Sequence, residues 1–199
     1  MASVIQVANR ALTKLGAARI ISLGDNNKQA RAVASCFDDL RDAELRAHRW
    51  SFALVRTALP ALTTTPAYEF QYEYQLPADF LRLDMIDGRY PSTVMDNYIG
   101  AETAEYAVEG GKILTNIAAP LKIRYCRRIE DPNEWDVLFR EALACRIAAE
   151  ICEELTQSNQ KKDAAWAEWK RAVGEAVKVN AIERPPQMPP DDQFIISRL

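Results

Sequence analysis

The sequence has little glycine, little proline and no long apolar run. Seven glycines and ten prolines among 199 residues exclude a collagen-like or linker-dominated chain. No stretch approaches the roughly 20 consecutive apolar residues that cross a bilayer, and Met1 to Ile5 do not open a secretory signal, so we expect neither a membrane span nor export. With 48% hydrophobic and 27% charged residues, we expect one globular domain, or one with an insertion, made in the cytoplasm.

Positive charge is not in excess either. The chain has 25 Lys and Arg against 28 Asp and Glu, a formal net charge of −3. A free-standing DNA-binding domain usually carries a basic excess, which this chain lacks. Contact with nucleic acid is therefore expected only through a local basic strip.

Cysteine and histidine are too few for the common metal and catalytic motifs. The four cysteines, Cys36, Cys126, Cys145 and Cys152, lie at spacings that match no zinc motif. Cys145 and Cys152 would lie about 10 Å apart along one helix, too far for a disulfide, so we expect buried thiols. The single histidine, His48, is expected to cap or pack at a helix end. No nucleophile elbow or phosphate loop is present, and we expect no catalytic residue, cofactor or metal.

Apolar residues at helical spacing predict four helices. They cover about residues 3–15, 27–49, 132–156 and 160–181. Ser3 is the expected N-cap of the first helix and Gly16 its C-terminal glycine. Asp131 and Pro132 are the expected cap and first residue of the third helix, which is apolar on two sides and is therefore expected at the centre of a bundle.

Between the second and third helices the period of the pattern changes from 3.6 to 2. Apolar and polar residues alternate from Tyr68 to Leu76, which is the clearest strand signal in the chain. Further strands are expected over about residues 80–86, 93–99, 105–109, 112–115 and 121–128. Asp87-Gly88 and Gly110-Gly111 are typical of tight turns. The region therefore predicts a small antiparallel β unit.

Together these patterns predict an α+β fold with a four-helix bundle core, an inserted small antiparallel β domain and an extended C-terminal arm. Residues 1–59 form the first half of the helical core and 60–129 the β unit. Residues 130–183 complete the helical core, and 184–199 form the arm.

The arm combines a proline run with an apolar end. The proline run is extended, because proline cannot continue a helix. Asp191 and Asp192 follow it, and the closing apolar triplet would expose apolar surface on a free tail. We therefore expect the arm to dock, on its own domain or on a neighbour. Its candidate docking residues are Pro185, Pro186, Met188, Pro189, Pro190, Phe194, Ile195 and Ile196.

A basic strip lies on the last predicted strand. Lys122, Arg124 and Arg128 share one strand face if the strand is regular, and Arg127 lies beside them in or just after the strand. These four residues are the candidate contacts with DNA phosphates or an acidic partner. The alternative interpretation is a solvated edge strand that is guarded against aggregation.

A group of carboxylates lies late in the third predicted helix. Two carboxylates that flank a cleft can hydrolyse glycosides, which makes Glu150, Glu153 and Glu154 the candidates for an enzymatic function. A solvated helix face is the simpler interpretation of such a charge run.

Scattered segments over about residues 3–180 carry a family resemblance. They are Ala11–Leu12, Leu15–Gly16, Ile21–Leu23, Trp50–Ala53, Tyr74–Arg82, Ile113–Asn116, Pro120–Tyr125, Asp131, Trp135, Phe139, Glu141–Ala144 and Ala148–Glu150. In this order they resemble the head-to-tail adaptors of short-tailed bacteriophages, also called tail tubular protein A.

The resemblance implies a structural role in the virion. Members of this family form a dodecameric ring between the portal protein ring and the tail nozzle protein, with helical cores side by side, C-terminal arms on the portal and DNA passing through the centre. It implies no catalytic residue, so the chain is expected not to be an enzyme. One branch of the family has been linked with peptidoglycan hydrolysis, which keeps a cell-wall hydrolase of the virion tail as the alternative.

Overall fold

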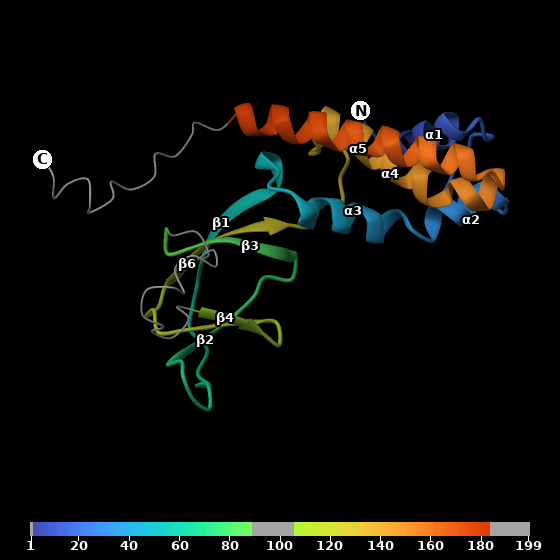
Figure 1. The fold of residues 1–199 in the computed structure, drawn as a ribbon. Helices are drawn as coiled ribbons and strands as arrows, with labels where there is room; N and C mark the ends of the chain where they lie inside the picture. The colour runs from blue at the N-terminus through green and yellow to red at the C-terminus, as the bar shows by residue number, and fades with distance from the viewer. Residues whose placement is uncertain (1, 89–105, 184–199) are drawn as a thin grey trace, which may run out of the picture.

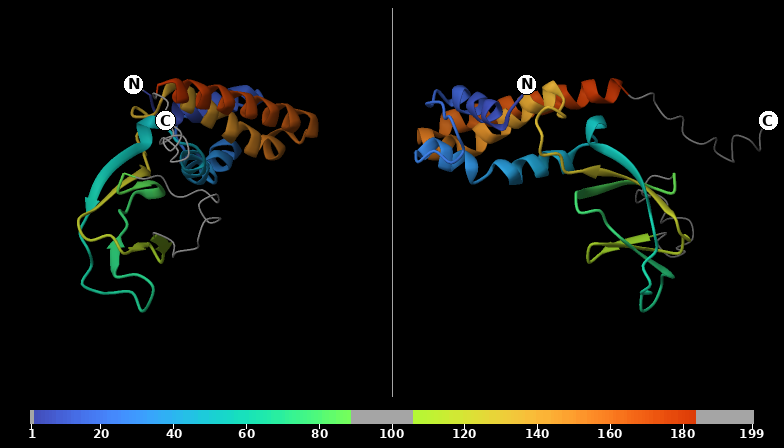
Figure 2. Two further views of the ribbon diagram at one scale, coloured as in Figure 1. Left: turned by 60° about the vertical axis from the view of Figure 1, so that its left-hand side comes forward. Right: turned by 180° about the vertical axis from the view of Figure 1, so that it is seen from behind.

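The computed structural model describes residues 2–88 and 106–183. Packed helices form one elongated unit, and two small antiparallel sheets form a second unit attached near one end of it (Figure 1). Figure 2 shows the same arrangement from two further sides. The predicted mixed α+β fold is therefore confirmed.

The first helix begins and ends where its caps predict. α1 spans Val4–Leu15. The Ser3 hydroxyl accepts a hydrogen bond from the Gln6 backbone N–H, and the Gln6 side chain accepts one from the Ser3 N–H. Gly16 has a φ of 71°, in the left-handed region, and ends the helix. Both predicted signals act locally, which is why they identify the helix correctly.

The predicted single helix over residues 27–49 is wrong, because the structure divides it. α2 spans Lys28–Ala34 and α3 spans Phe37–Ala47. At the break, the Ser35 hydroxyl and the Cys36 thiol donate back to the Ala32 carbonyl oxygen. Such side-chain bonds compete with the helical ladder, and Cys36 leaves helical conformation.

The last two helices lie close to their predicted positions. α4 spans Val137–Thr156 and α5 spans Asn159–Ile182. The cap of α4 is Asp136, whereas the predicted cap Asp131 instead accepts hydrogen bonds from Asn133 in a turn. The prediction that α4 begins at Pro132 is therefore wrong by about one turn. No helix in the described ranges has the length and apolar character needed to cross a bilayer.

The helical core is one continuous apolar cluster with α4 at its centre. α4 contacts α1, α2, α3 and α5, as its two apolar sides predict. Phe139 of α4 is fully buried, with its ring centroid 5.1 Å from that of Trp50 and 5.6 Å from that of Trp135. Edge-to-face contacts of this kind add to the gain from burial.

Within the described residues, two three-stranded sheets build the β unit. The first sheet has the order β1 (Leu54–Leu59), β6 (Leu121–Arg127), β3 (Phe80–Ile86), and the second has the order β2 (Tyr72–Gln75), β5 (Lys112–Thr115), β4 (Tyr106–Glu109). All neighbouring strands are antiparallel, which confirms that part of the prediction. Gly110 and Gly111 both have positive φ and form the predicted hairpin turn between β4 and β5.

Several predicted strands change their bounds. The strand expected from Tyr68 to Leu76 is limited to β2, because Glu69 is in left-handed conformation and Tyr68 is exposed. The expected strand 93–99 lies outside the described residues. β1 was not predicted and lies within the segment 1–59, although it pairs with β6 of the β unit.

The β unit has its own small apolar core. Leu121, Ile123 and Tyr125 of β6 point into it, together with Tyr74 and Ile113 from the second sheet. Cys126 belongs instead to the helical core, because it lies on the opposite face of β6. The same strand thus contributes to both cores.

Candidate functional site

The predicted basic strip lies on β6 and just after it, at the junction of the two units. Lys122 and Arg124 alternate with the buried residues Leu121, Ile123 and Tyr125, so both lie on the face turned away from the β core. They therefore share a face, as the sequence predicts. Arg128 follows the strand end.

Intramolecular carboxylates pair with three of the four basic residues. Arg124 forms an ion pair with Asp84, and Arg127 forms one with Glu134. Arg128 donates from Nε to Asp42 Oδ2 at 2.6 Å. Lys122 is exposed and has no acidic partner in the described ranges. The predicted contact with DNA or a partner stays a prediction. The free positive charge of the basic strip is smaller than the sequence suggests.

Arg56 is a basic residue of this face that the sequence analysis missed. In the register of β1 and β6, Arg56 lies opposite Arg124 and Ala58 lies opposite Lys122. Arg56 is exposed, and among the described residues it has no carboxylate partner. Arg56 and Lys122 line the same shallow hollow, together with Met85. Only the strand register brings these residues together, since they are far apart in the sequence.

Asp84 of β3 is a buried carboxylate that holds the junction together. Its side chain is 2% exposed, and Oδ1 accepts from Arg49 Nε at 2.5 Å while Oδ2 accepts from Arg124. Arg49 follows the end of α3, whereas Arg124 belongs to β6. Asp84 therefore links the helical unit to the first sheet by charge-assisted hydrogen bonds.

Two further arginines join α3 to β3 in reciprocal fashion. The Arg82 guanidinium donates to the carbonyl oxygens of Arg46, at 2.7 Å, and His48, at 3.0 Å, which end α3. Arg46 in turn donates to the Leu81 carbonyl oxygen. A cation at a helix C-terminus interacts favourably with the helix dipole. Arg82 therefore fills the capping role that the sequence predicts for His48.

His48 itself is half-buried and its ring packs edge-on against Trp50, with centroids 5.6 Å apart. Burial, together with the nearby positive charge of Arg82, lowers the pKa of His48. The packing role predicted for His48 is thus seen, and the histidine is neutral at neutral pH.

The three candidate carboxylates of α4 are exposed. Glu153 accepts a hydrogen bond from Lys162, which lowers the pKa of Glu153. A general acid for glycoside hydrolysis requires a raised pKa, so Glu153 is shifted in the opposite direction. Glu150 lies 3.9 Å from Arg146, and neither contact builds a catalytic arrangement.

A polar network between α1, α4 and α5 contains three potential metal ligands. Glu141, Cys145 and Glu168 have donor atoms within 4.8 Å of one another. The Lys14 ammonium lies among them, 2.8 Å from Glu141 and 2.6 Å from Glu168. Burial alone would lower the pKa of Lys14, but these hydrogen bonds outweigh it and raise the pKa. The protein's own cation thus occupies this position, which makes the group an interhelical salt-bridge network.

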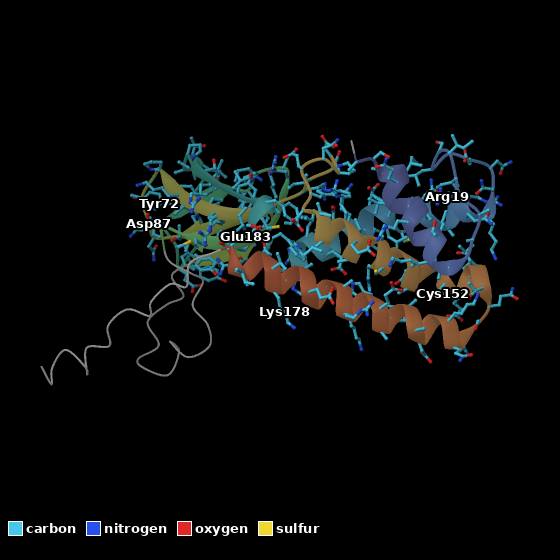
Figure 3. The ribbon with its side chains drawn as sticks, turned by 90° about the horizontal axis from the view of Figure 1, so that it is seen from above. Arg19, Tyr72, Asp87, Cys152, Lys178 and Glu183 are labelled. Carbon is cyan, nitrogen blue, oxygen red and sulfur yellow. The ribbon has the colours of Figure 1, made fainter. Side chains whose placement is uncertain are left out.

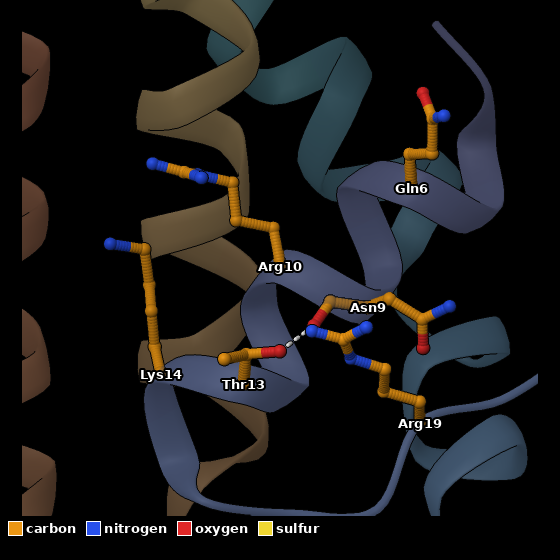
Figure 4. Close-up of a pocket in the computed structure, with 6 residues that line it drawn as sticks. All are labelled: Gln6, Asn9, Arg10, Thr13, Lys14 and Arg19. Carbon is orange, nitrogen blue, oxygen red and sulfur yellow. Dashed lines mark hydrogen bonds between the residues drawn. The ribbon is translucent and has the colours of Figure 1, made fainter.

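A shallow pocket lies over the outer face of α1 (Figure 4). The Asn9 side chain both donates to and accepts from the Ile20 backbone, and the Thr13 hydroxyl donates to the Asn9 carbonyl oxygen. Arg10 and Lys14 are committed to Glu141. The two bonds of the Asn9 side chain hold the connector after α1 in place, whereas Arg10 and Lys14 link α1 to α4.

Glu44 of α3 is a second buried carboxylate that the sequence analysis missed. Its Oε1 accepts from Trp169 Nε1 of α5 at 3.0 Å and lies 3.8 Å from Arg146 Nε of α4. Arg146 also stacks on Trp166 and Trp169, 4.4 and 4.7 Å from their ring centroids. Burial raises the pKa of Glu44, and Oε2 has no hydrogen-bond partner within the described residues.

The four thiols lie singly in the packed interior. Cys126, Cys145 and Cys152 are buried and Cys36 is partly buried. Burial raises the pKa of Cys36 and of Cys126 to about 11, so both are protonated at neutral pH. They act as small apolar side chains, as expected.

The predicted docking arm begins at the end of α5. Its candidate residues from Pro185 to Ile196 lie outside the described residues. Just before it, the Asn180 side chain accepts from the Ser51 N–H at 2.7 Å and donates to the Arg49 carbonyl oxygen at 2.6 Å. Glu183, labelled at the end of α5 in Figure 3, accepts a hydrogen bond from the Ser51 hydroxyl at 3.2 Å. The end of α5, directly before the predicted arm, is therefore fixed at the junction of the two units.

No protein-family model and no curated protein matches this chain. Its function is therefore argued from its residues and geometry.

Proposed function

We propose that this chain is a structural head-to-tail connector of a tailed bacteriophage, which joins the portal ring to the tail nozzle. Copies of the chain form a dodecameric ring in the virion and line the passage of double-stranded DNA, which they contact without sequence specificity. The helical core acts as a four-helix bundle closed across the inserted β unit. The chain is made in the host cytoplasm and has no catalytic role.

The observation that carries the proposal is the way α5 presents the arm. α5 is a helix of 24 residues that lies along the helical unit and ends at the junction (Figure 3). Asn180 and Glu183 both bind Ser51 there. A segment that docks on another subunit benefits from a fixed starting point. Each residue that becomes ordered only on binding loses conformational entropy, which weakens the binding. The ordered resemblance of the sequence to phage adaptors supports the same role.

The charge of the basic strip is consistent with a passage for DNA. Unpaired arginines on the surface of a channel would each bind a DNA phosphate. Every such contact adds affinity and therefore slows the movement of the duplex. Here Asp84, Glu134 and Asp42 pair with three arginines of that strip and reduce its free positive charge. The residual charge favours weak, transient contact.

A mixture of the full chain with the portal ring of a short-tailed phage tests the proposal, with electron microscopy as the readout. We expect a closed collar on the ring, and we expect deletion of residues 184–199 to abolish it. The finer variant is Phe194→Asp with Ile195→Asp, and its matched control is Ile21→Asp, an apolar residue that is 90% exposed on the helical unit. Undiminished portal binding by the deleted chain would overturn the role of the arm.

A further inference from the structure

The open part of the first sheet carries two cations on neighbouring strands. Arg56 of β1 and Lys122 of β6 are exposed, and no carboxylate of the described residues neutralises either one. Between them lies a hollow whose lining includes Ala58, Met85 and Gly88. The surface is thus cationic with apolar elements in its floor, which suits an occupant that combines carboxylates with apolar side chains.

The helical unit covers only one end of this sheet face. Leu54 lies opposite Cys126 in the register, and both pack against the helical core. Two residues further along β1, at Arg56, the same face is open. The open patch therefore begins where the helical unit stops.

We propose that residues 191–196 of the same chain occupy this hollow in the free subunit. This segment places Asp191 and Asp192 directly before the apolar Phe194, Ile195 and Ile196. The two carboxylates complement Arg56 and Lys122, and the apolar triplet covers the floor of the hollow.

The length of the arm allows this contact within one chain. Glu183 bonds to Ser51, and the five residues from Ser51 to Arg56 span at most about 18 Å. The eight residues from Glu183 to Asp191 are rich in proline and reach about 25 Å in extended conformation. The tether is therefore longer than the span, and a short tether gives an effective concentration of about millimolar.

The contact holds the arm on its own subunit until a stronger partner displaces it. Its charge pairs are exposed, so it is weak and weakens further as salt increases. The inference goes beyond the proposed function and does not depend on it, since it concerns the isolated subunit alone.

Chymotrypsin cleavage after Phe194, followed by mass spectrometry of the full chain, tests the contact. We expect cleavage to be about tenfold faster in Asp191→Lys with Asp192→Lys, because two exposed ion pairs become repulsive. We expect the same acceleration in Arg56→Glu with Lys122→Glu. The combined four-substitution variant reverses both partners and is expected to regain the slow rate of the natural sequence.

The matched control is Lys170→Glu with Arg171→Glu, which makes the same change of charge on exposed residues of α5. It is expected to leave the rate unchanged. Equal rates in the natural chain and in the Asp191→Lys, Asp192→Lys variant would overturn the proposal, and this variant changes no residue of the described helices and strands. Protection that rises with protein concentration would overturn it too, because it would assign the hollow to the arm of a second copy. Portal binding is measured separately, so either result leaves the proposed function to its own test.

Discussion

The interior of the helical unit and its junction with the β unit depend on different interactions. The helical unit has one large apolar cluster around α4, whereas the β unit has a small core between two three-stranded sheets. The contacts that orient the β unit on α3 are largely polar, and Asp84 and Arg82 make several of them. The helical unit therefore owes its stability to burial. The placement of the β unit depends on a few charged groups, together with the apolar contacts that Leu54, Leu81 and Cys126 make with the helical core.

The aromatic residues allow the two units to be followed separately. Trp135, Trp166 and Trp169 belong to the helical unit and Trp50 packs into its core, whereas the described tyrosines lie in the β region. Tryptophan emission therefore reports the helical unit, and hydrogen exchange of the strands reports the β unit.

The largest expected effect is in the helical core, at Phe139. Phe139→Ala leaves a cavity beside Trp50 and Trp135 and is expected to lower the free energy of unfolding by about 4 kcal/mol. Urea denaturation followed by tryptophan emission measures the change. Val137→Ala is the control, because Val137 is 65% exposed on the same helix and its loss is expected to cost less than about 0.5 kcal/mol. Similar losses in the two variants would contradict the central role of α4.

Local signals in the sequence predicted part of the fold, whereas contacts between distant residues could not be predicted. The ends of α1 were predicted correctly because Ser3 and Gly16 act within one turn of the helix. The break at Ser35 was missed because side-chain bonds to a backbone carbonyl leave the hydrophobic period unchanged. β1 was missed because its partner β6 lies more than 60 residues away in the chain.

The candidate site was predictable only in part for the same reason. Lys122 and Arg124 were placed on one face of a strand by their spacing alone. Their partners are distant in the sequence: Asp84 is 40 residues from Arg124. Ion pairs of this kind have no local pattern, so the sequence overstated the free charge of the strip.

The second effect concerns the junction, through Asp84. Asp84→Ala removes a buried carboxylate shared by Arg49 and Arg124, and leaves Arg124 facing Arg56 across the strands. We expect a loss of about 3 kcal/mol, because removing one partner of a buried ion pair is strongly destabilising. Hydrogen exchange is expected to rise in β1, β3 and β6 before the helices are affected. Glu109→Ala, an exposed carboxylate of β4, is the control and is expected to change neither quantity. An equal increase in hydrogen exchange over the strands and the helices would show that the two units do not open independently.

The smallest effect is a gain in stability at Glu44. Burial raises the pKa of Glu44 in the folded chain, so folding favours its protonated form. The contribution of Glu44 is therefore most favourable below the ordinary glutamate pKa and is lost as pH rises through the raised value. In Glu44→Gln the amide oxygen still accepts from Trp169 Nε1, while the unpartnered Oε2 loses its charge.

We expect Glu44→Gln to be more stable than the natural chain by about 1 kcal/mol at neutral pH, with the difference shrinking toward pH 4. Urea denaturation at several pH values measures it, and Glu150→Gln is the matched control, because Glu150 is an exposed carboxylate near the same Arg146. A variant less stable than the natural chain at every pH would mean that the attraction of Arg146 outweighs the burial of the charge. The helical unit would then depend on a charged contact in the same way as the junction does, and the contrast between the two units would be one of degree.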